Sequence, residues 1–317
     1  MKPGYFFKRL FLFISFALAS YIFLLIVFSH NFFKNKIPNL HNFSTPREIK
    51  EFSELRSPVN KDIVFIGSSH AEFEPPVFQQ DGIKALNVSI SSLRPITAYY
   101  FLKGEIQNIS CKVIALETYY HLINEEYLYK EAILQIIGNE HMSMNFAQMT
   151  LASKDFAVIN SGIGICFYHA FHPLNIMEPL EPETTPTATG KATVAAKLKD
   201  ELSNIEPYTS PFTNTAIMYL QQSIDIIKNS GKKAMLIMAP VTETQKNKCL
   251  NYAMICNSLD SLAKKNDIPF LNYNTPENFA RVGLSNDDFY DSNHLTKNGK
   301  EKFSKTVSQD LKKLNIF

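Results

Sequence analysis

The sequence predicts a three-layer α/β/α domain of the flavodoxin-like type, preceded by one transmembrane helix. A long uncharged apolar segment lies near the N-terminus, short apolar runs recur along the rest of the chain, and helical patterns separate most of these runs. Strands that alternate with helices form βαβ units, which build a parallel sheet covered on both faces. With 317 residues, 45% of them hydrophobic, the chain is long enough for a sizeable core.

The first element is an apolar segment at residues 10–28 that carries no charged side chain. As a helix it nearly matches a hydrocarbon core of ~30 Å. Basic but no acidic residues precede it, so the positive-inside rule keeps the N-terminus cytoplasmic. A cleaved signal peptide is the alternative, because residues 17–19 read small-x-small, but the apolar run continues well beyond them. We expect residues 1–36 to anchor the chain in the inner membrane, with the rest in the periplasm.

Five apolar runs are the expected strands of the sheet. They lie at residues 62–67, 85–88, 112–117, 234–239 and 268–273. Apolar residues at helical spacing predict helices at residues 96–106, 217–227, 255–262 and 303–311. Five such strands suit one doubly wound domain.

Two segments stand outside this alternation. Residues 37–60 are polar, with Pro and Ser, and we expect them to form a stalk from the membrane to a domain at residues 61–317. Residues 121–212 read as an insertion, helical and rich in Met and aromatic residues at first, then polar and rich in Pro and Thr. Such an insertion suits a lid, a partner-binding arm or a solvated excursion without a role.

Composition excludes several functional classes. A net charge of +2 gives no field that would attract nucleic acid, and no Gly-rich dinucleotide or P-loop motif is present. The four cysteines include no C-x-x-C pair, so we expect neither a zinc site nor a redox centre. Cys249 and Cys256 could form a disulfide or remain thiols. We expect no metal and no diffusible cofactor.

The candidate catalytic residues lie next to predicted element ends. The first strand ends in Gly67-Ser68-Ser69-His70, and Asp291 stands three residues before His294, ahead of the last helix. In open α/β sheets, ligands bind beyond the carboxyl ends of the strands. An Asp at this spacing can hold Nδ1–H of the imidazole, which leaves Nε2 free to accept a proton from a serine.

These residues resemble the SGNH (GDSL-type) hydrolases. Residues 66–69 are similar to the family's first block, Gly-Asp-Ser after strand one, with Ser68 in place of Asp. The resemblance makes Ser69 the nucleophile, with Ser68 as the alternative. Asp291 and His294 match the family's last block, D-x-x-H, and the resemblance makes them the orienting acid and the general base.

The resemblance also implies an oxyanion hole. Residues 86–92 resemble the second block, whose Gly N–H is a donor, and that Gly falls on Ser92, or less well on Ser89. Ser69 N–H is the other expected donor. The third block, G-x-N-D, is missing after strand three, where Thr118 or Tyr119 would have to supply the third donor. Loss of one donor typically costs ~2.7–4 kcal/mol of transition-state stabilisation.

The Gly-Ser-Ser variant and the single anchor resemble one corner of this superfamily, the membrane-tethered proteins that act on cell-envelope polymers. These include the D-alanyl transfer proteins of teichoic-acid biosynthesis and the alginate acetylation proteins. The resemblance implies an acyl esterase or O-acyltransferase for envelope polysaccharide, working beside a membrane-bound O-acyltransferase. A catalytically weak or inactive scaffold of the same fold is one alternative, and a lipase or thioesterase is another.

Other polar residues have simpler interpretations. His70 is expected to point away from the pocket or to line it, and Glu117 to be a charge on the rim of the sheet. His169 and His172 flank apolar residues and lack a third metal ligand, so packing is expected for both.

Overall fold

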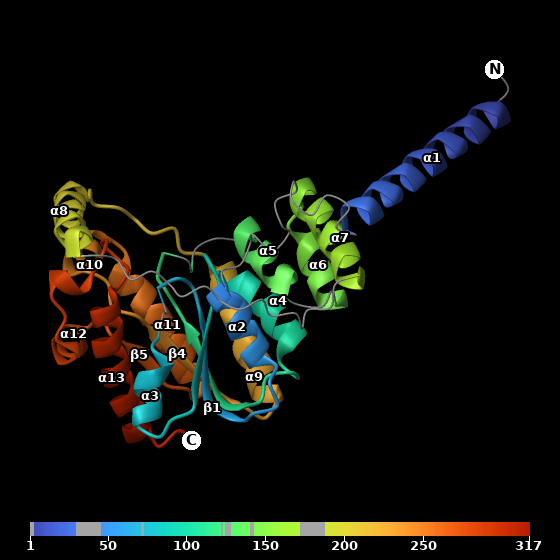
Figure 1. Ribbon diagram of the computed structural model, residues 1–317. Coiled ribbons are helices and arrows are strands. Elements are labelled where there is room, and N and C mark those ends of the chain that lie inside the picture. Colours follow the sequence, from blue (N-terminus) through green and yellow to red (C-terminus); the bar gives the residue numbers. More distant parts are fainter. Residues whose placement is uncertain are drawn as a thin grey trace.

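The computed structural model describes residues 3–29, 46–70, 73–121, 123, 128–139, 143–171 and 188–317 (Figure 1). Within them, five parallel strands form one sheet in the order β2-β1-β3-β4-β5, the flavodoxin-like order. The strands are β1 (Lys61–Gly67), β2 (Ala85–Ser89), β3 (Cys111–Glu117), β4 (Lys233–Met238) and β5 (Phe270–Asn272). The predicted fold class is confirmed, and β5 is shorter than expected.

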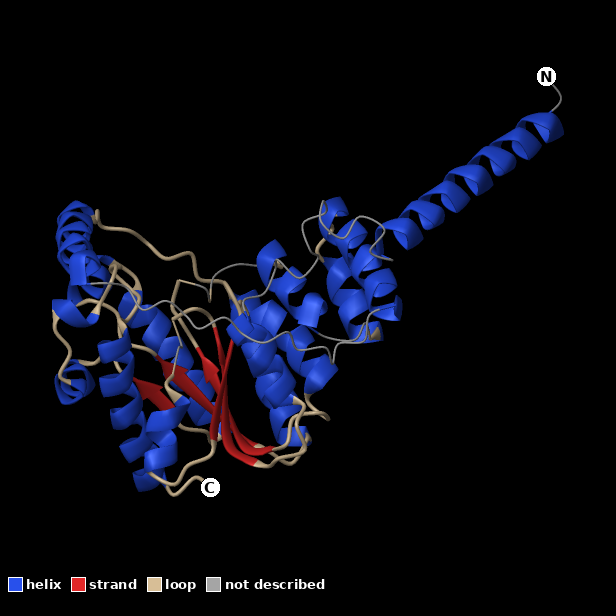
Figure 2. Cartoon of the chain, viewed as in Figure 1, coloured by secondary structure: helices blue, strands red, loops and turns tan. Residues whose placement is uncertain are grey.

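Helices cover both faces of the sheet (Figure 2). One face carries α2 (Pro46–Leu55), α4 (Pro95–Glu105), α9 (Asn214–Asn229) and α11 (Tyr252–Asn266). The other carries α3 (Pro75–Gln80), α12 (Pro276–Val282) and α13 (Lys297–Leu314).

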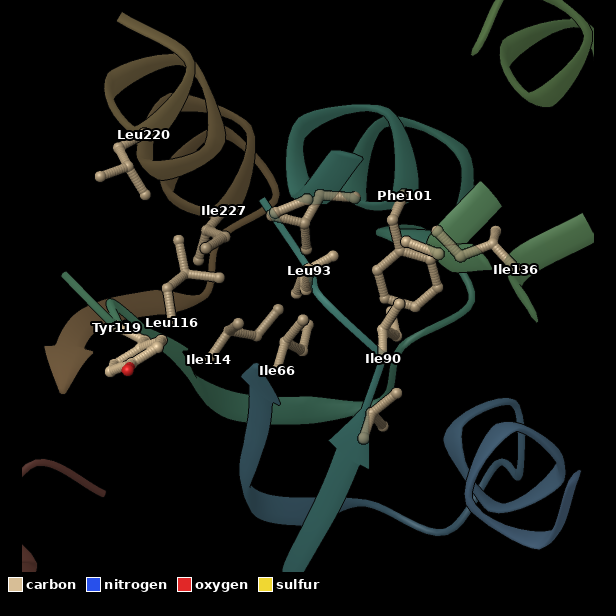
Figure 3. Packing of buried hydrophobic residues seen from close by; sticks show 14 of the residues in the cluster. Ile66, Ile90, Leu93, Phe101, Ile114, Leu116, Tyr119, Ile136, Leu220 and Ile227 are labelled. Carbon is tan, nitrogen blue, oxygen red and sulfur yellow. The ribbon is translucent and has the colours of Figure 1, made fainter. Parts of the chain in front are cut away.

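Each strand supplies alternate residues to two separate cores. In β1, Val64 and Ile66 enter the core beneath α4 and α9, whereas Ile63 and Phe65 enter the core beneath α3 and α13. Figure 3 shows part of the first core, where Ile66 lies among aliphatic side chains from β3 and α9. This two-sided burial explains why the strands read as continuous apolar runs instead of alternating ones.

The segment predicted as a stalk differs from the expectation in its second half. Residues 46–55 form α2, and its Phe52 and Leu55 are buried against the core beside β2. The sequence does place apolar residues at positions 49, 52 and 55, a helical spacing that the polar composition of residues 37–60 concealed.

The predicted insertion forms two groups of helices at opposite ends of the molecule (Figure 1). The first group, α5 (Lys130–Asn139), α6 (Met144–Ala152) and α7 (Phe156–Phe171), packs together and against α4. The second is α8 (Ala188–Asn204), which contacts the short helix η2 (Asn286–Asp288). Helix α1 (Pro3–Ser29) projects away from the rest of the molecule. Its segment Gly4–Val27 has a mean hydropathy of 2.7.

Three cysteines, Cys111, Cys249 and Cys256, are free thiols in this structure. The Cys249 thiol donates to Asn251 Oδ1, and Cys256 Sγ accepts from Asn272 Nδ2. The disulfide considered between Cys249 and Cys256 is therefore not formed in this structure.

Candidate active site

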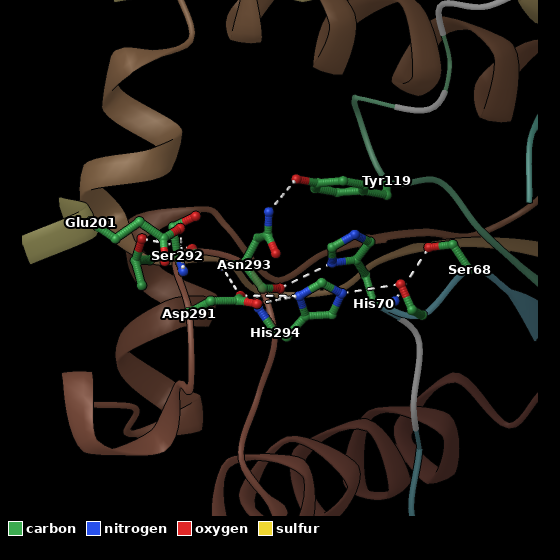
Figure 4. Close-up of polar contacts among 10 residues, drawn as sticks. Ser68, His70, Tyr119, Glu201, Asp291, Ser292, Asn293 and His294 are labelled. Atoms are coloured by element: carbon green, nitrogen blue, oxygen red, sulfur yellow. Dashed lines mark hydrogen bonds and ion pairs between the residues drawn. The ribbon is translucent and has the colours of Figure 1, made fainter. Parts of the chain in front are cut away.

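Ser69, His294 and Asp291 form a hydrogen-bonded chain at the carboxyl edge of the sheet, and Figure 4 shows His294 beside Asp291. Ser69 Oγ lies 3.1 Å from His294 Nε2, and His294 Nδ1 lies 2.8 Å from Asp291 Oδ2. A carboxylate can only accept, so Nδ1 carries the proton of the neutral ring and Nε2 presents a lone pair to the Ser69 hydroxyl. The side chains of His294 and Asp291 are 22% and 24% exposed, so solvent can reach the pair.

Asp291 is held as a carboxylate. Besides the hydrogen bond from the His294 ring, the carboxylate accepts two from backbone N–H groups. Asn293 N–H and His294 N–H both donate to Asp291 Oδ1, at 2.9 and 2.7 Å. Burial raises the pKa of Asp291, but the bonds from the His294 ring and these amides outweigh burial and lower the pKa below its ordinary value. The local turn therefore fixes both the charge of the acid and the direction of the imidazole.

The loop that carries these residues, residues 288–296 (the His294 loop), is anchored at the start of α13. The buried carboxylate of Asp288 accepts a hydrogen bond from Lys302 Nζ at 2.8 Å. The backbone carbonyl of Asp288 accepts one from Thr296 N–H, also at 2.8 Å. Gly299 permits this approach, because a Cβ there would lie 2.4 Å from the Asp288 carbonyl oxygen. Glycine at position 299 is thus required by close backbone packing.

Two further elements hold the middle of the His294 loop. The Ser292 carbonyl accepts from both the backbone N–H and the hydroxyl of Thr242, which follows β4. On the opposite side, Glu201 Oε1 of α8 accepts the Ser292 N–H at 3.1 Å (Figure 4). This contact could not be predicted from the sequence, because the partner of Glu201 is a backbone amide nearly a hundred positions away.

Ser68 is turned away from the His294 ring. It is fully buried, and both its hydroxyl and its N–H donate to Glu117 Oε2, at 2.9 and 3.1 Å. Burial raises the pKa of Glu117 to about 7, although the two bonds from Ser68 act in the opposite direction. The interpretation of Glu117 as a rim charge is therefore corrected, since it fixes the turn that presents Ser69. The hydroxyl proton of Ser68, the alternative nucleophile, is donated to Glu117 and not to His294.

His70 lies against the candidate base. Its ring stacks on His294, with centroids 4.1 Å apart and planes inclined by 19°, and the ring of Tyr119 covers it at 3.7 Å. His70 Nδ1 lies 3.1 Å from the Asn293 carbonyl oxygen, an acceptor, so Nδ1 carries a proton. Burial and the neighbouring His294 lower the pKa of His70 to about 3, which keeps this ring neutral.

The expected oxyanion donors are placed unequally. Ser92 adopts φ +51°, a left-handed conformation that favours glycine, which agrees with its place in the resemblance. No described residue accepts a hydrogen bond from the N–H of Ser69 or of Ser92. By contrast, the Thr118 hydroxyl is buried and donates to the Ile237 carbonyl, and Tyr119 Oη accepts from Asn293 Nδ2 at 3.2 Å.

Thr118 therefore does not fit the expected role of third donor, because its only hydroxyl proton is used within the sheet. Tyr119 covers His70 with its ring, and its hydroxyl proton has no acceptor among the described residues, so its expected role as third donor stays a prediction. Of the two remaining histidines considered in the sequence, His169 lies in α7 and His172 lies outside the described residues.

Comparisons with known proteins give a distant likeness of fold. No family model and no curated protein matches the chain. One similar solved structure is described as a "putative acylhydrolase" from Bacteroides fragilis, with 13% identity and a TM-score of 0.42 over 86% of this chain and 98% of that one. Another is a GDSL-like lipase from Bacteroides thetaiotaomicron, with 14% identity and a TM-score of 0.42 over 87% and 100%. At such values the chemistry of those proteins does not carry over to this chain.

Proposed function

We propose that this protein is a membrane-anchored, extracytoplasmic acyl esterase or O-acyltransferase of the SGNH type that acts on cell-envelope polysaccharide. The observation that carries the proposal is the continuous chain from Ser69 Oγ through His294 to Asp291, with bonds of 3.1 and 2.8 Å. The match of these residues to the first and last blocks of the SGNH pattern supports the family. The uncharged run of residues 10–28 in helix α1 and the basic residues before that run support the anchor and its orientation.

The proposed reaction begins with Ser69. Its Oγ attacks an ester carbonyl while His294 Nε2 takes the hydroxyl proton, and Asp291 stabilises the imidazolium that forms. Collapse of the tetrahedral intermediate breaks the ester C–O bond, and His294 returns the proton to the leaving alcohol. A water or a sugar hydroxyl then gives its proton to His294, attacks the acyl-enzyme and releases an acid or a new ester, which restores the Ser69 hydroxyl.

Two backbone donors support the developing negative charge in this proposal. They are the N–H groups of Ser69 and Ser92, neither of which has an acceptor among the described residues. The sequence lacks the Asn that supplies a third donor in the family pattern. We therefore expect slow turnover compared with a complete site, on the order of 10²–10³-fold in kcat.

A fluorophosphonate probe tests the proposal. Such probes label a serine only where a base activates it, so the folded chain should be labelled and Ser69→Ala should not. Ser68→Ala is the matched control, since its hydroxyl bonds to Glu117 and not to His294. Absence of labelling in a correctly folded wild-type chain would favour the inactive scaffold, the rival supported by the missing third block.

Substrate preference separates the remaining alternative. An esterase or transferase for envelope polysaccharide should cleave acetylated sugars in preference to long-chain esters, and a lipase or thioesterase should show the reverse. A shaped acyl pocket discriminates by about 10- to 200-fold per methylene. The proposed partners are the acylated polysaccharide and a membrane-bound O-acyltransferase, with no role for nucleic acid.

A further inference from the structure

Helix α7 presents an uncharged face to its surroundings. None of its residues from Phe156 to Phe171 is Asp, Glu, Lys or Arg. Its Val158 and Ile165 side chains are buried, as its packing on α5 and α6 requires. Phe156, in contrast, is 82% exposed and Ile163 is 39% exposed. These two residues lie seven positions apart, at a spacing that places them on the same face of a helix.

This face continues directly into α1. The two helices are in contact (Figure 1), and the Tyr21 hydroxyl of α1 donates to Asn160 Oδ1 of α7. Asn160 lies between Phe156 and Ile163 on the same helical face, four and three residues from them. The apolar face of α7 therefore adjoins the helix that is long and apolar enough to cross a membrane.

The position of Tyr21 along α1 sets the level of α7. Lys8 and Arg9 lie within Gly4–Val27, so the hydrocarbon core is matched by the uncharged run of residues 10–28, whose 19 residues span close to ~30 Å at ~1.5 Å per residue. Tyr21 lies seven positions before Phe28, about 10 Å along the helix axis from that end of the run. The face of α7 beside Tyr21 is therefore at the depth that the apolar side of an interfacial helix reaches, ~5–10 Å below the boundary between headgroups and acyl chains.

We propose that the exposed face of α7, formed by Phe156, Asn160 and Ile163, is a membrane-docking surface that lies in the interfacial region of the bilayer crossed by α1. Its partner is the lipid itself, because the face is contiguous with α1 and bears aromatic and aliphatic groups without charge. The inference rests on the anchor of the proposed function and not on its chemistry. Docking at α7 gives the domain a second attachment and so fixes its orientation towards the membrane.

The absence of Trp from the sequence offers a direct test. Three single variants of the full chain, Phe156→Trp, Phe16→Trp and Leu250→Trp, each carry one indole. The full chain is reconstituted in vesicles of phosphatidylglycerol and phosphatidylcholine, with bromine on the upper acyl chain of the latter. Phe16 is 74% exposed on α1 and reports the span, whereas Leu250 is 70% exposed on the domain, away from α7. All three sites are exposed, so each variant should keep the fold.

We expect strong quenching of Phe156→Trp and Phe16→Trp by brominated lipid, and none of Leu250→Trp. Adding Tyr21→Phe to Phe156→Trp removes the bond to Asn160 and should reduce the quenching at position 156 alone. Quenching at position 16 without quenching at position 156 would overturn the docking surface and leave the anchor intact. Absence of quenching at position 16 would overturn the anchor and the docking surface together, while fluorophosphonate labelling of Ser69 would still stand.

Discussion

His70 illustrates how a residue beside the candidate triad can support it without reacting. Its neutral ring stacks on His294, and its Nδ1–H holds the Asn293 carbonyl, one residue from the base. His70→Phe keeps the stacked ring and loses the hydrogen bond, so we expect roughly a 2- to 10-fold fall in kcat/KM. His70→Ala loses both interactions, so its kcat/KM should be lower still.

The pH dependence of kcat/KM on a soluble ester tests whether the His70 ring is neutral. With a ring pKa of about 3, His70 does not titrate between about pH 5 and 8. The profiles of the wild-type chain and of His70→Phe should therefore have the same shape over this range and differ in rate. A limb that is present in the wild type and absent in His70→Phe would contradict the neutral ring.

Glu117 links the turn at Ser68 to pH. Its pKa is raised from 4.5 to about 7, so between these values the folded state binds more protons than the unfolded state. The free energy of unfolding should therefore fall as pH rises through this window, by something on the order of 1–3 kcal/mol. Glu117→Gln keeps an acceptor for Ser68 and cannot ionise. The free energy of unfolding of this variant should therefore fall less over the same pH window. Urea unfolding of both proteins at a series of pH values measures the difference, and parallel curves would contradict the prediction.

At the scale of elements, α8 connects the insertion to the His294 loop. Glu201 Oε1 accepts the N–H of Ser292, the residue directly after Asp291. Glu201→Ala should loosen the His294 loop and lower kcat by roughly 2- to 10-fold, about the effect of one hydrogen bond. Glu201→Gln retains the acceptor and is the matched control. Equal losses in both variants would show that charge, and not the hydrogen bond, is what matters at this position.

The strands and the ends that bear Ser69 and His294 could be predicted because they follow strong local patterns. An apolar run of six or seven residues marks a buried strand, and parallel strands bring their carboxyl ends to one edge. The contacts of Glu117 and Glu201 could not be predicted, because each carboxylate binds a backbone N–H that has no signature in sequence. Helix α2 was missed for a different reason, since the polar composition of its segment outweighed the helical spacing of Ile49, Phe52 and Leu55.

At the scale of the whole molecule, helix α1 contacts the α/β domain at α7 but takes no part in its cores. Every buried residue of the two described cores lies at Phe52 or beyond, and the exposed helix α1 contributes none. The Ser69–His294–Asp291 chain is positioned by β1, α8, α13 and the loop after β4, all of them remote from α1 in Figure 1. The fold therefore gives no reason for the site to depend on the anchor.

Removal of residues 1–36 should then leave the site intact. We expect the shortened chain to keep its unfolding midpoint within a few degrees and its kcat on a soluble ester within about twofold, since no core residue is lost. Its turnover of an ester embedded in vesicles should fall strongly, because the membrane no longer concentrates enzyme and substrate on one surface. Parallel assays with soluble and embedded esters measure the two effects. Loss of activity on the soluble ester would mean that α1 also supports the α/β domain, although α1 contributes no residue to the described cores.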